Sequence, residues 1–183
     1  MMKKLILMIV IATLIFGACS AAPAASDAAK TDSGLVKGAF TEEDLVFVLD
    51  GKPFPLNTDA APLLTAFGGE YETTTAPSCV YEGEDKQFDF AFASVFTYPT
   101  DGKDLIDEID IYGGDYQTTK GIRLGSGKEE VLAQYGKGED KGDMIVYTLS
   151  GDPKDLKSPQ LFFDIEDNKV TGISYYAASN VAE

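Results

Sequence analysis

Carboxyl groups are the side chains of this chain most able to do chemistry, because its 183 residues include 30 Asp and Glu and no histidine. Two short runs hold acids close enough to share a ligand: Glu82, Glu84 and Asp85 in one, and Asp164, Glu166 and Asp167 in the other. Neither run has the twelve-residue spacing of a calcium-binding loop. We therefore expect solvated turns and strand faces there, and we predict no metal site, no cofactor and no catalytic residue.

The missing histidine excludes His-based catalytic triads and His-ligated metal sites. A carboxylate-dependent envelope hydrolase stays open as an alternative, because it needs only two acids that converge in a pocket. Scattered acids in a chain of formal net charge −15 do not identify such a pair. The residues therefore predict that the protein is not an enzyme. The same acidity disfavours nucleic acid as a partner, since a negative surface repels phosphates.

The chain has two cysteines, Cys19 and Cys79. Because Cys19 has another predicted role, described below, Cys79 has no disulfide partner. It also has no histidine to activate it as a nucleophile. We expect Cys79 to be a small buried residue near a strand, as free cysteines usually are.

Tyrosines on or beside the predicted strands are the best candidates for a binding surface. A sheet covered by a helix on one face leaves its other face free, and tyrosine often supplies binding energy at interfaces. We expect the phenylalanines to lie mostly in the core. The predicted exposed binding face consists of Tyr98, Tyr112, Tyr147, Tyr175 and Tyr176.

The first 18 residues have the layout of a secretory signal. Lys3 and Lys4 precede an apolar run of 12 residues, Leu5 to Phe16, which is too short for a comfortable membrane span. The segment Phe16-Gly17-Ala18-Cys19 resembles the bacterial lipobox, which implies cleavage after residue 18 and lipid on Cys19. The alternative is an ordinary signal peptide with a coincidental cysteine. Residues 19–40 are rich in Ala and Ser and predict a flexible tether.

Two segments that are 68 positions apart organise the remainder of the chain. Gly51–Gly68 and Thr119–Gly136 align so that Leu63 matches Val131 and Phe67 matches Tyr135. Each segment predicts a short helix that ends at its glycine. The first helix is capped by Thr58 or Asp59, and the second by Ser126 in a capping box with Glu129.

The strands that follow also align, although at an offset of 64, where Asp104–Tyr112 matches Asn168–Tyr176. Because isolated short helices are unstable, each one must pack on a sheet. The sequence therefore predicts an α+β fold of two tandem repeats, residues 41–118 and 119–183, each with a short helix on an antiparallel sheet.

The most distinct strand signals lie between these helices. Asp50-Gly51 and Asp167-Asn168 predict two-residue hairpin turns, and Thr100–Lys103 predicts a further turn. Residues 88–98 predict one continuous strand, because phenylalanines recur at every second position. Ser78–Tyr81 is a second strand candidate, separated by Pro77 from a candidate that precedes it.

The segment G-I-R-L-G-S-G-K-E-E-V-L-A-Q-Y-G (121–136) and the closing K-V-T-G-I-S-Y (169–175) resemble the tandem-repeat β-lactamase inhibitory protein family. They are also similar to small lipoproteins of outer-membrane protein assembly, which hold one such unit. Ser78–Gly83, Phe88–Phe90, Thr97–Pro99 and Gly102–Asp104 resemble lipoproteins of Gram-positive bacteria that carry two units. The resemblance implies the fold; the loop acid that enters the active site in the inhibitor matches no residue here.

Together these features predict a lipid-anchored lipoprotein on the extracytoplasmic face of the cell membrane. Its expected role is to bind a protein or an envelope ligand through the free face of its sheets, and the sequence does not set its oligomeric state. The first alternative is a proteinaceous inhibitor of a secreted hydrolase such as a β-lactamase, and the second is the hydrolase described above.

Replacing Cys19 by alanine should release the protein from membranes, because the variant has no thiol to carry lipid. Membrane and soluble fractions of producing cells would be compared by immunoblotting, with Cys79→Ala as the control that keeps the lipobox cysteine. A Cys19→Ala variant that stays with the membrane would contradict lipidation.

Overall fold

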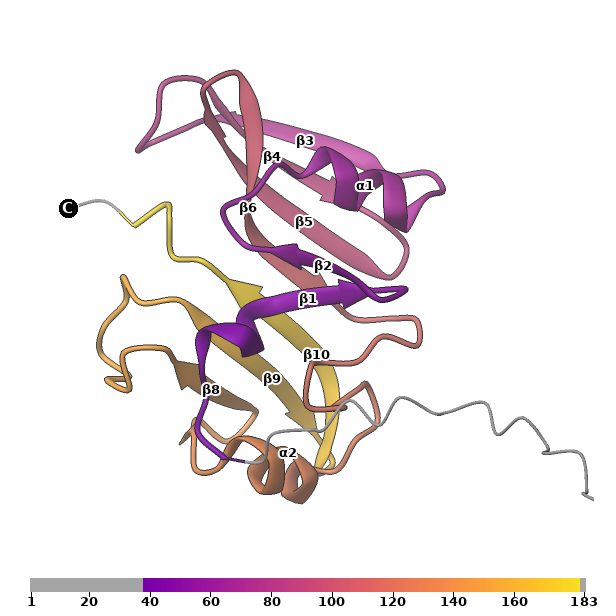
Figure 1. The fold of residues 1–183 in the computed structure, drawn as a ribbon, viewed down its shortest axis with the longest axis vertical. Helices are drawn as coiled ribbons and strands as arrows, with labels where there is room; N and C mark the ends of the chain where they lie inside the picture. The colour runs from indigo at the N-terminus through magenta and orange to yellow at the C-terminus, as the bar shows by residue number, and fades with distance from the viewer. Residues whose placement is uncertain (1–37, 182–183) are drawn as a thin grey trace, which may run out of the picture. The chain divides into compact units, whose positions relative to one another are not determined.

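A computed structural model describes residues 38–181, so the predicted signal, the lipobox cysteine and most of the tether lie outside the described residues. The part described is a mixed α/β structure with one large antiparallel sheet and two α-helices (Figure 1). It begins with the 3₁₀ turn η1, Glu42–Leu45, and a hairpin of β1, Val46–Leu49, and β2, Lys52–Pro55. No helix between residues 38 and 181 is long and apolar enough to cross a membrane.

The large sheet has eight antiparallel strands in the order β3-β4-β5-β6-β10-β9-β8-β7. Helix α1, Ala61–Phe67, comes before strands β3 to β6 of this sheet in the chain, and α2, Lys128–Tyr135, comes before β7 to β10. The strands are β3 Glu72–Pro77, β4 Glu84–Asp89, β5 Ala93–Thr100, β6 Lys103–Ile111, β7 Glu139–Asp140, β8 Met144–Thr148, β9 Gln160–Glu166 and β10 Lys169–Tyr176.

Both helices lie where the glycine-terminated segments predict them. Helix α1 starts where the Asp59 carboxylate accepts a hydrogen bond from the Ala61 N–H at 3.0 Å. Helix α2 starts one residue later than predicted, because the Glu130 carboxylate, rather than that of Glu129, accepts from the Gly127 N–H at 2.9 Å. Ser126 is therefore not its cap.

Three two-residue turns connect hairpins in the described part of the chain. Asp50-Gly51, Asp101-Gly102 and Asp167-Asn168 all have positive φ at both positions, between 50° and 76°. This is the conformation that lets two strands pair directly after a two-residue loop. The three predicted turns are therefore confirmed.

The continuous strand predicted for residues 88–98 is wrong. Strand β4 ends at Asp89 and β5 begins at Ala93, and the Phe90 N–H donates to the Ala93 carbonyl at 2.8 Å to close a tight turn. Phe90 and Phe92 of this turn still reach the core, where their rings lie 5.1 and 5.3 Å from the Phe67 ring. The spacing of the phenylalanines therefore continues through the turn. Residues 78–81 form a loop instead of the second predicted strand.

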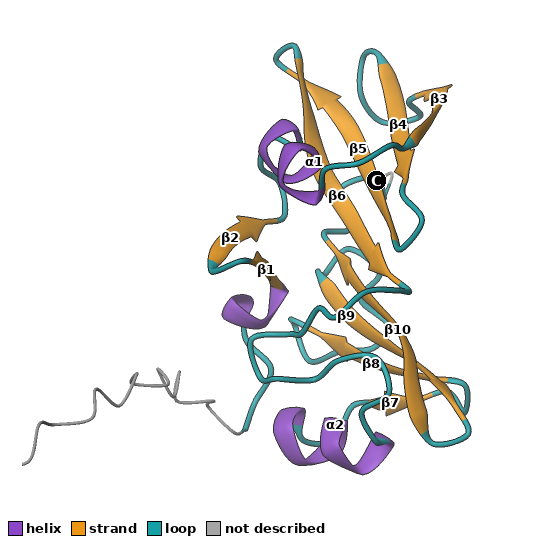
Figure 2. Cartoon of the chain, turned by 90° about the vertical axis from the view of Figure 1, so that its right-hand side faces the viewer, coloured by secondary structure: helices purple, strands orange, loops and turns teal. Residues whose placement is uncertain are grey.

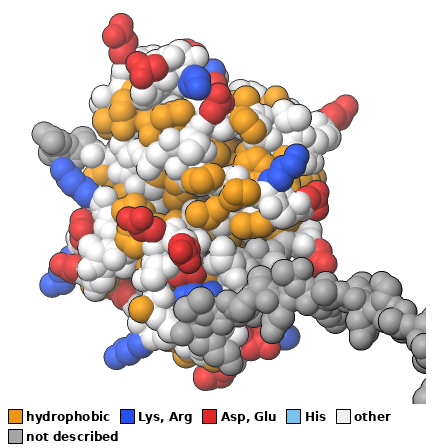
Figure 3. All heavy atoms as spheres, in the orientation of Figure 1, with side chains coloured by type: hydrophobic (Ala, Val, Ile, Leu, Met, Phe, Trp, Pro, Cys, Tyr) orange, Lys and Arg blue, Asp and Glu red, His pale blue; other side chains and the backbone are white. Residues whose placement is uncertain are grey.

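One face of the sheet is covered, and no helix formed by residues 38–181 lies on the other. Figure 2 shows α1, α2 and the β1–β2 hairpin on the same side of the strands. The strand residues that face this side form the core, together with Leu63 of α1 and Val131 of α2. The strand residues of this core include Val95, Ile109, Ile111, Ile145, Tyr147, Leu161, Phe163, Ile173 and Tyr175. Hydrophobic side chains also reach the surface across the middle of this side (Figure 3).

Strands β6 and β10 meet at the middle of the sheet over four residue pairs, from Ile111↔Ile173 to Glu108↔Tyr176. We call this contact the seam. It joins the four strands that follow α1 to the four that follow α2. Each α-helix is preceded by a segment that hydrogen-bonds to the start of the nearer seam strand, residues 57–60 to β6 and residues 125–128 to β10.

A buried ion pair fixes the start of the described chain to the loop before α2. Asp44 and Lys120 are only 2% and 5% exposed, and their charged atoms lie 2.8 Å apart. The Lys120 ammonium also donates to the Ala39 carbonyl at 3.1 Å and lies 4.5 Å from the centroid of the Tyr135 ring. The other carboxylate oxygen of Asp44 accepts from the Thr119 hydroxyl at 3.1 Å. Both charges are thus paired and hydrogen-bonded.

Replacing Asp44 by alanine should lower the free energy of unfolding by about 3–5 kcal/mol, because it leaves the Lys120 charge buried without a partner. Asp104, which pairs with Lys86 at 2.8 Å where both side chains are about one-third exposed, supplies the control. Its replacement by alanine should cost less than about 1 kcal/mol. Urea denaturation measures both values, and equal losses would contradict the importance of burial.

Candidate functional site

The candidate site is the face of the sheet that no described helix covers, which we call the open face. Strand pairing aligns its side chains in two neighbouring rows that cross the strands. Row one consists of Glu72, Asp89, Ser94, Asp110, Ser174, Phe162, Val146 and Glu139. Row two consists of Thr74, Gln87, Phe96, Glu108, Tyr176, Gln160 and Thr148.

Side-chain hydrogen bonds hold the members of row one that lie on β4 and β5. One oxygen of the Asp89 carboxylate accepts from the Gln87 amide at 2.8 Å and from the Ser94 hydroxyl at 2.6 Å. The hydroxyls of Ser94 and Tyr112 lie 3.3 Å apart, and the Tyr112 hydroxyl donates to the Phe90 carbonyl at 2.8 Å. This network orients the side chains of β4 and β5 before any ligand arrives.

Two acids lie side by side on the seam. Glu108 and Asp110 occupy neighbouring rows of β6, opposite Tyr176 and Ser174 of β10. Burial, followed by the charge of the Asp110 carboxyl, raises the pKa of Glu108 to about 8. Burial also raises the pKa of Asp110 above its usual range. The pair therefore holds a proton at neutral pH, because burial and the mutual repulsion of the two carboxyls both disfavour a second negative charge.

A third acid with a raised pKa lies on β9. Burial and the nearby Asp143 charge raise the pKa of Asp164, and its cross-strand partner is Gly172 of β10. A β-carbon at Gly172 would overlap a carboxyl oxygen of Asp164. The glycine therefore leaves the space into which this carboxyl extends.

The five tyrosines predicted to form an exposed face do not lie together. Tyr147 and Tyr175 point into the core and are 4% and 1% exposed, so for these two the prediction is wrong. Tyr98 has the register of the open face but is also buried. Tyr112, at 48% exposed, and the half-buried Tyr176 remain on the open face.

The loop of residues 78–83 covers Tyr98. The Tyr81 ring stacks on the Tyr98 ring at 4.6 Å, and its hydroxyl donates to the Ser179 carbonyl at 3.0 Å. The loop and the C-terminal segment thereby close one end of the open face. Cys79 in this loop is exposed, which corrects the prediction that it is buried, because loop 78–81 replaces the expected strand.

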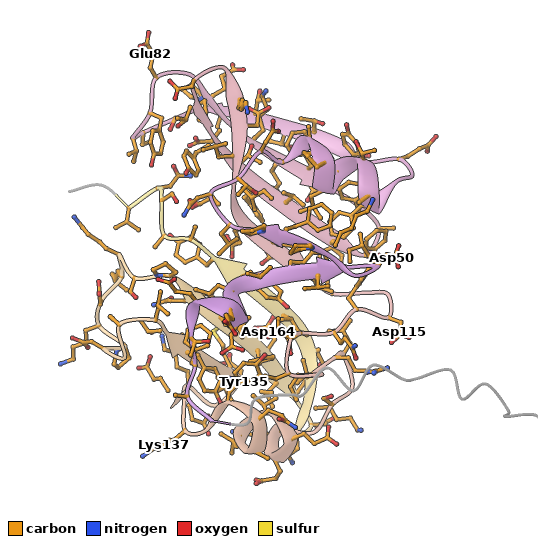
Figure 4. All side chains as sticks on the ribbon, in the orientation of Figure 1. Asp50, Glu82, Asp115, Tyr135, Lys137 and Asp164 are labelled. Carbon is orange, nitrogen blue, oxygen red and sulfur yellow. The ribbon has the colours of Figure 1, made fainter. Side chains whose placement is uncertain are left out.

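The two acidic runs singled out in the sequence lie apart. Figure 4 shows Glu82 at the outer end of loop 78–83, well away from Asp164. Between residues 38 and 181, no three acidic or cysteine side chains are grouped so that they could hold a metal ion. The seam acids Glu108 and Asp110 belong to neither run, and their alternation with Ile109 and Ile111 is the sequence signal that would have placed them together on one face.

Several hollows lie elsewhere on the molecule, with volumes from about 440 to about 730 Å³. One contains the buried Asp44–Lys120 pair at its wall, and another lies between the β1–β2 turn and residues 115–119. Neither Glu108 nor Asp110 lines any of the five hollows described. Glu108 and Asp110, whose pKa values are raised, therefore lie on the sheet surface outside these hollows.

A scan of protein-family models and searches of curated proteins and of solved structures found no match to this chain.

Replacing Glu108 by glutamine should stabilise the protein at high pH. A carboxyl whose pKa is raised by folding favours the folded state below its unfolded pKa of about 4.3, and this contribution is lost as the pH rises through about 8. The variant should therefore match the wild type near pH 4 and exceed its free energy of unfolding by roughly 1–2 kcal/mol near pH 9, since partial hydration reduces the full effect.

Denaturation in urea at several pH values measures this difference. Glu166→Gln is the control, because Glu166 is exposed at the end of β9, and it should change the free energy of unfolding by less than about 0.5 kcal/mol. A Glu108→Gln difference that stays constant from pH 4 to pH 9 would show that Glu108 does not titrate in this range.

Proposed function

We propose that this protein is a lipid-anchored, extracytoplasmic, non-enzymatic lipoprotein that binds a protein or an envelope ligand through the open face. We further propose that it is built from two tandem α+β repeats, residues 41–118 and 119–183, each with its helix packed on its own four strands. The anchor rests on the sequence from Lys3 to Cys19.

Equivalent hydrogen bonds support the repeats. The Asn57 N–H donates to the Ile106 carbonyl at 2.8 Å, and the Gly125 N–H donates to the Val170 carbonyl at 2.7 Å. In the opposite direction, Ile106 donates to Thr58 and Val170 donates to Ser126. Donors and acceptors in the helix segments differ by 68 positions, and those in the seam strands by 64, which are the offsets of the sequence alignment.

Bulges and hairpin lengths support the repeats as well. Asp107 of β6 and Thr171 of β10 are each the extra residue of a bulge, and they are also 64 positions apart. Counted from the turn to the bulge, β5 and β6 each have two more residues than β9 and β10. These four additional residues equal the change in offset from 68 to 64.

Side chains at the centre of the open face support a role in binding. Phe96 and Tyr176 flank Glu108 in row two, and the Phe162 ring lies 6.3 Å from the Tyr176 ring. All four side chains are half-buried. Rigid aromatic rings set among oriented polar groups are typical of surfaces that gain binding energy from a few residues. This central group is the observation on which the proposed function rests.

The carboxylate-dependent hydrolase is favoured by one observation, the pair of acids with raised pKa values on the seam. Perturbed acids are common at catalytic sites, which usually also enclose the substrate. Glu108 and Asp110 lie on a sheet surface outside the five described hollows, so binding explains their setting better. Hydrolysis of a glycoside or ester that disappears in Glu108→Gln would support the enzyme instead.

Inhibition of a secreted hydrolase and the family resemblance stay predictions.

A photoreactive benzoylphenylalanine at Tyr112 should form covalent adducts with discrete components of the envelope when producing cells are irradiated. Tyr71 is the matched control, because it is 45% exposed against 48% for Tyr112 and packs on Phe88 and Phe90 on the helix-bearing side. Adducts would be resolved by gel and mass spectrometry. The absence of adducts at Tyr112, or the same adducts at both positions, would contradict binding through the open face.

A further inference from the structure

Along its two rows, the open face carries one sign of charge. Its two rows contain five acids, Glu72, Asp89, Glu108, Asp110 and Glu139, and neither row contains a lysine or an arginine. Asp164 adds a further carboxyl next to Gly172. Neutral positions between these acids are filled by aromatic rings, hydroxyls, amides and the aliphatic Val146. The face is therefore both acidic and aromatic.

The central acids form no ion pair with a described lysine or arginine. Of the six ion pairs between described residues, one uses an acid of the rows, Glu139, which pairs with Lys141 at 3.4 Å. Glu108 and Asp110 pair with no cation within residues 38–181. One carboxyl oxygen of Asp110 is enclosed and accepts no hydrogen bond. The seam carboxyls can therefore pair with a cation from a binding partner.

We propose that the partner of the open face is a polypeptide segment rich in arginine and lysine, which lies across the seam. This inference rests on the proposed function and names the chemistry of its partner. Adjacent strands are about 4.8 Å apart, so Asp89 and Asp110, which are two strands apart in row one, are separated by roughly 10 Å. Asp110 and Asp164 are also two strands apart, on β6 and β9. A segment with several cationic side chains can contact these acids at once.

Aromatic rings next to the acids favour cationic side chains further. Phe96 and Tyr176 lie on either side of Glu108 across the strands. A guanidinium group can donate two hydrogen bonds to a carboxylate and stack on a neighbouring ring, whereas an anionic or purely apolar segment can do neither. A nearby cation also favours ionisation of the two seam carboxyls, which otherwise repel each other. Binding to this chain should therefore weaken with salt.

The test uses the full lipidated chain in a neutral detergent and deca-arginine as the probe, with affinity measured by isothermal titration calorimetry. The double variant Glu108→Gln/Asp110→Asn removes both seam carboxyls, which share a proton at neutral pH. Its fold should persist because the lost charges are ones that burial disfavours. The control Glu43→Gln/Glu129→Gln removes two exposed acids, from η1 and α2, and so reduces the net negative charge at least as much.

The seam variant should raise the Kd for deca-arginine about tenfold or more, and the control variant less than about twofold. Equal weakening in both variants would overturn the inference, since attraction would then come from total charge alone. Binding of deca-glutamate as tight as that of deca-arginine would overturn it too.

The adducts at Tyr112 separate this inference from the proposed function. If they form while the seam variant binds deca-arginine as the wild type does, the basic partner is wrong and binding through the open face survives. If neither adducts nor seam-dependent peptide binding are found, both are wrong. Adducts together with a seam-dependent Kd support both.

Discussion

Four residue pairs between β6 and β10 hold the two halves of the large sheet together. They join the strands that follow α1 to those that follow α2, and they make one sheet where two smaller ones would otherwise have free edges. Their side chains alternate between the two faces. Ile109 and Ile111 meet Tyr175 and Ile173 in the core, while Glu108 and the acid two residues further on meet the open face. The contact that holds the sheet together is therefore also the contact that places two acids side by side.

Local signals predicted the parts of the fold whose conformation depends on a few neighbouring residues. The turns at Asp50, Asp101 and Asp167 and the glycine ends of both helices are of this kind, because positive φ is a local property. The strand expected at residues 88–98 failed since periodicity alone does not show that Phe90 and Phe92 belong to a turn. Tertiary contacts with Phe67 decide their position, and such contacts are not visible in one sequence.

The candidate surface was only partly predictable for the same reason. Tyrosine type indicated a binding role, yet the face on which a tyrosine lies depends on strand register, which bulges at Asp107 and Thr171 shift by one residue. Tyr147 and Tyr175 have the register of the core face, and a loop that the sequence predicts as a strand covers Tyr98. The alternation of the seam acids with Ile109 and Ile111 indicates that they share a face, but only the pairing of β6 with β10 shows that they lie at the centre of the sheet.

The buried pair of Asp44 and Lys120 has a mechanical consequence. If Cys19 carries the proposed lipid anchor, a pull between the membrane and a partner would enter the folded part near Gly38, whose N–H donates to the Gln134 carbonyl at 3.2 Å. The next contacts along the chain are the Lys120 ammonium on the Ala39 carbonyl and the ion pair itself. Force would therefore reach the loop before α2 and α2 itself before it reaches α1, so the C-terminal half of the sheet would take the strain first. A tensile load would act on this buried ion pair before it reached the strands of the open face.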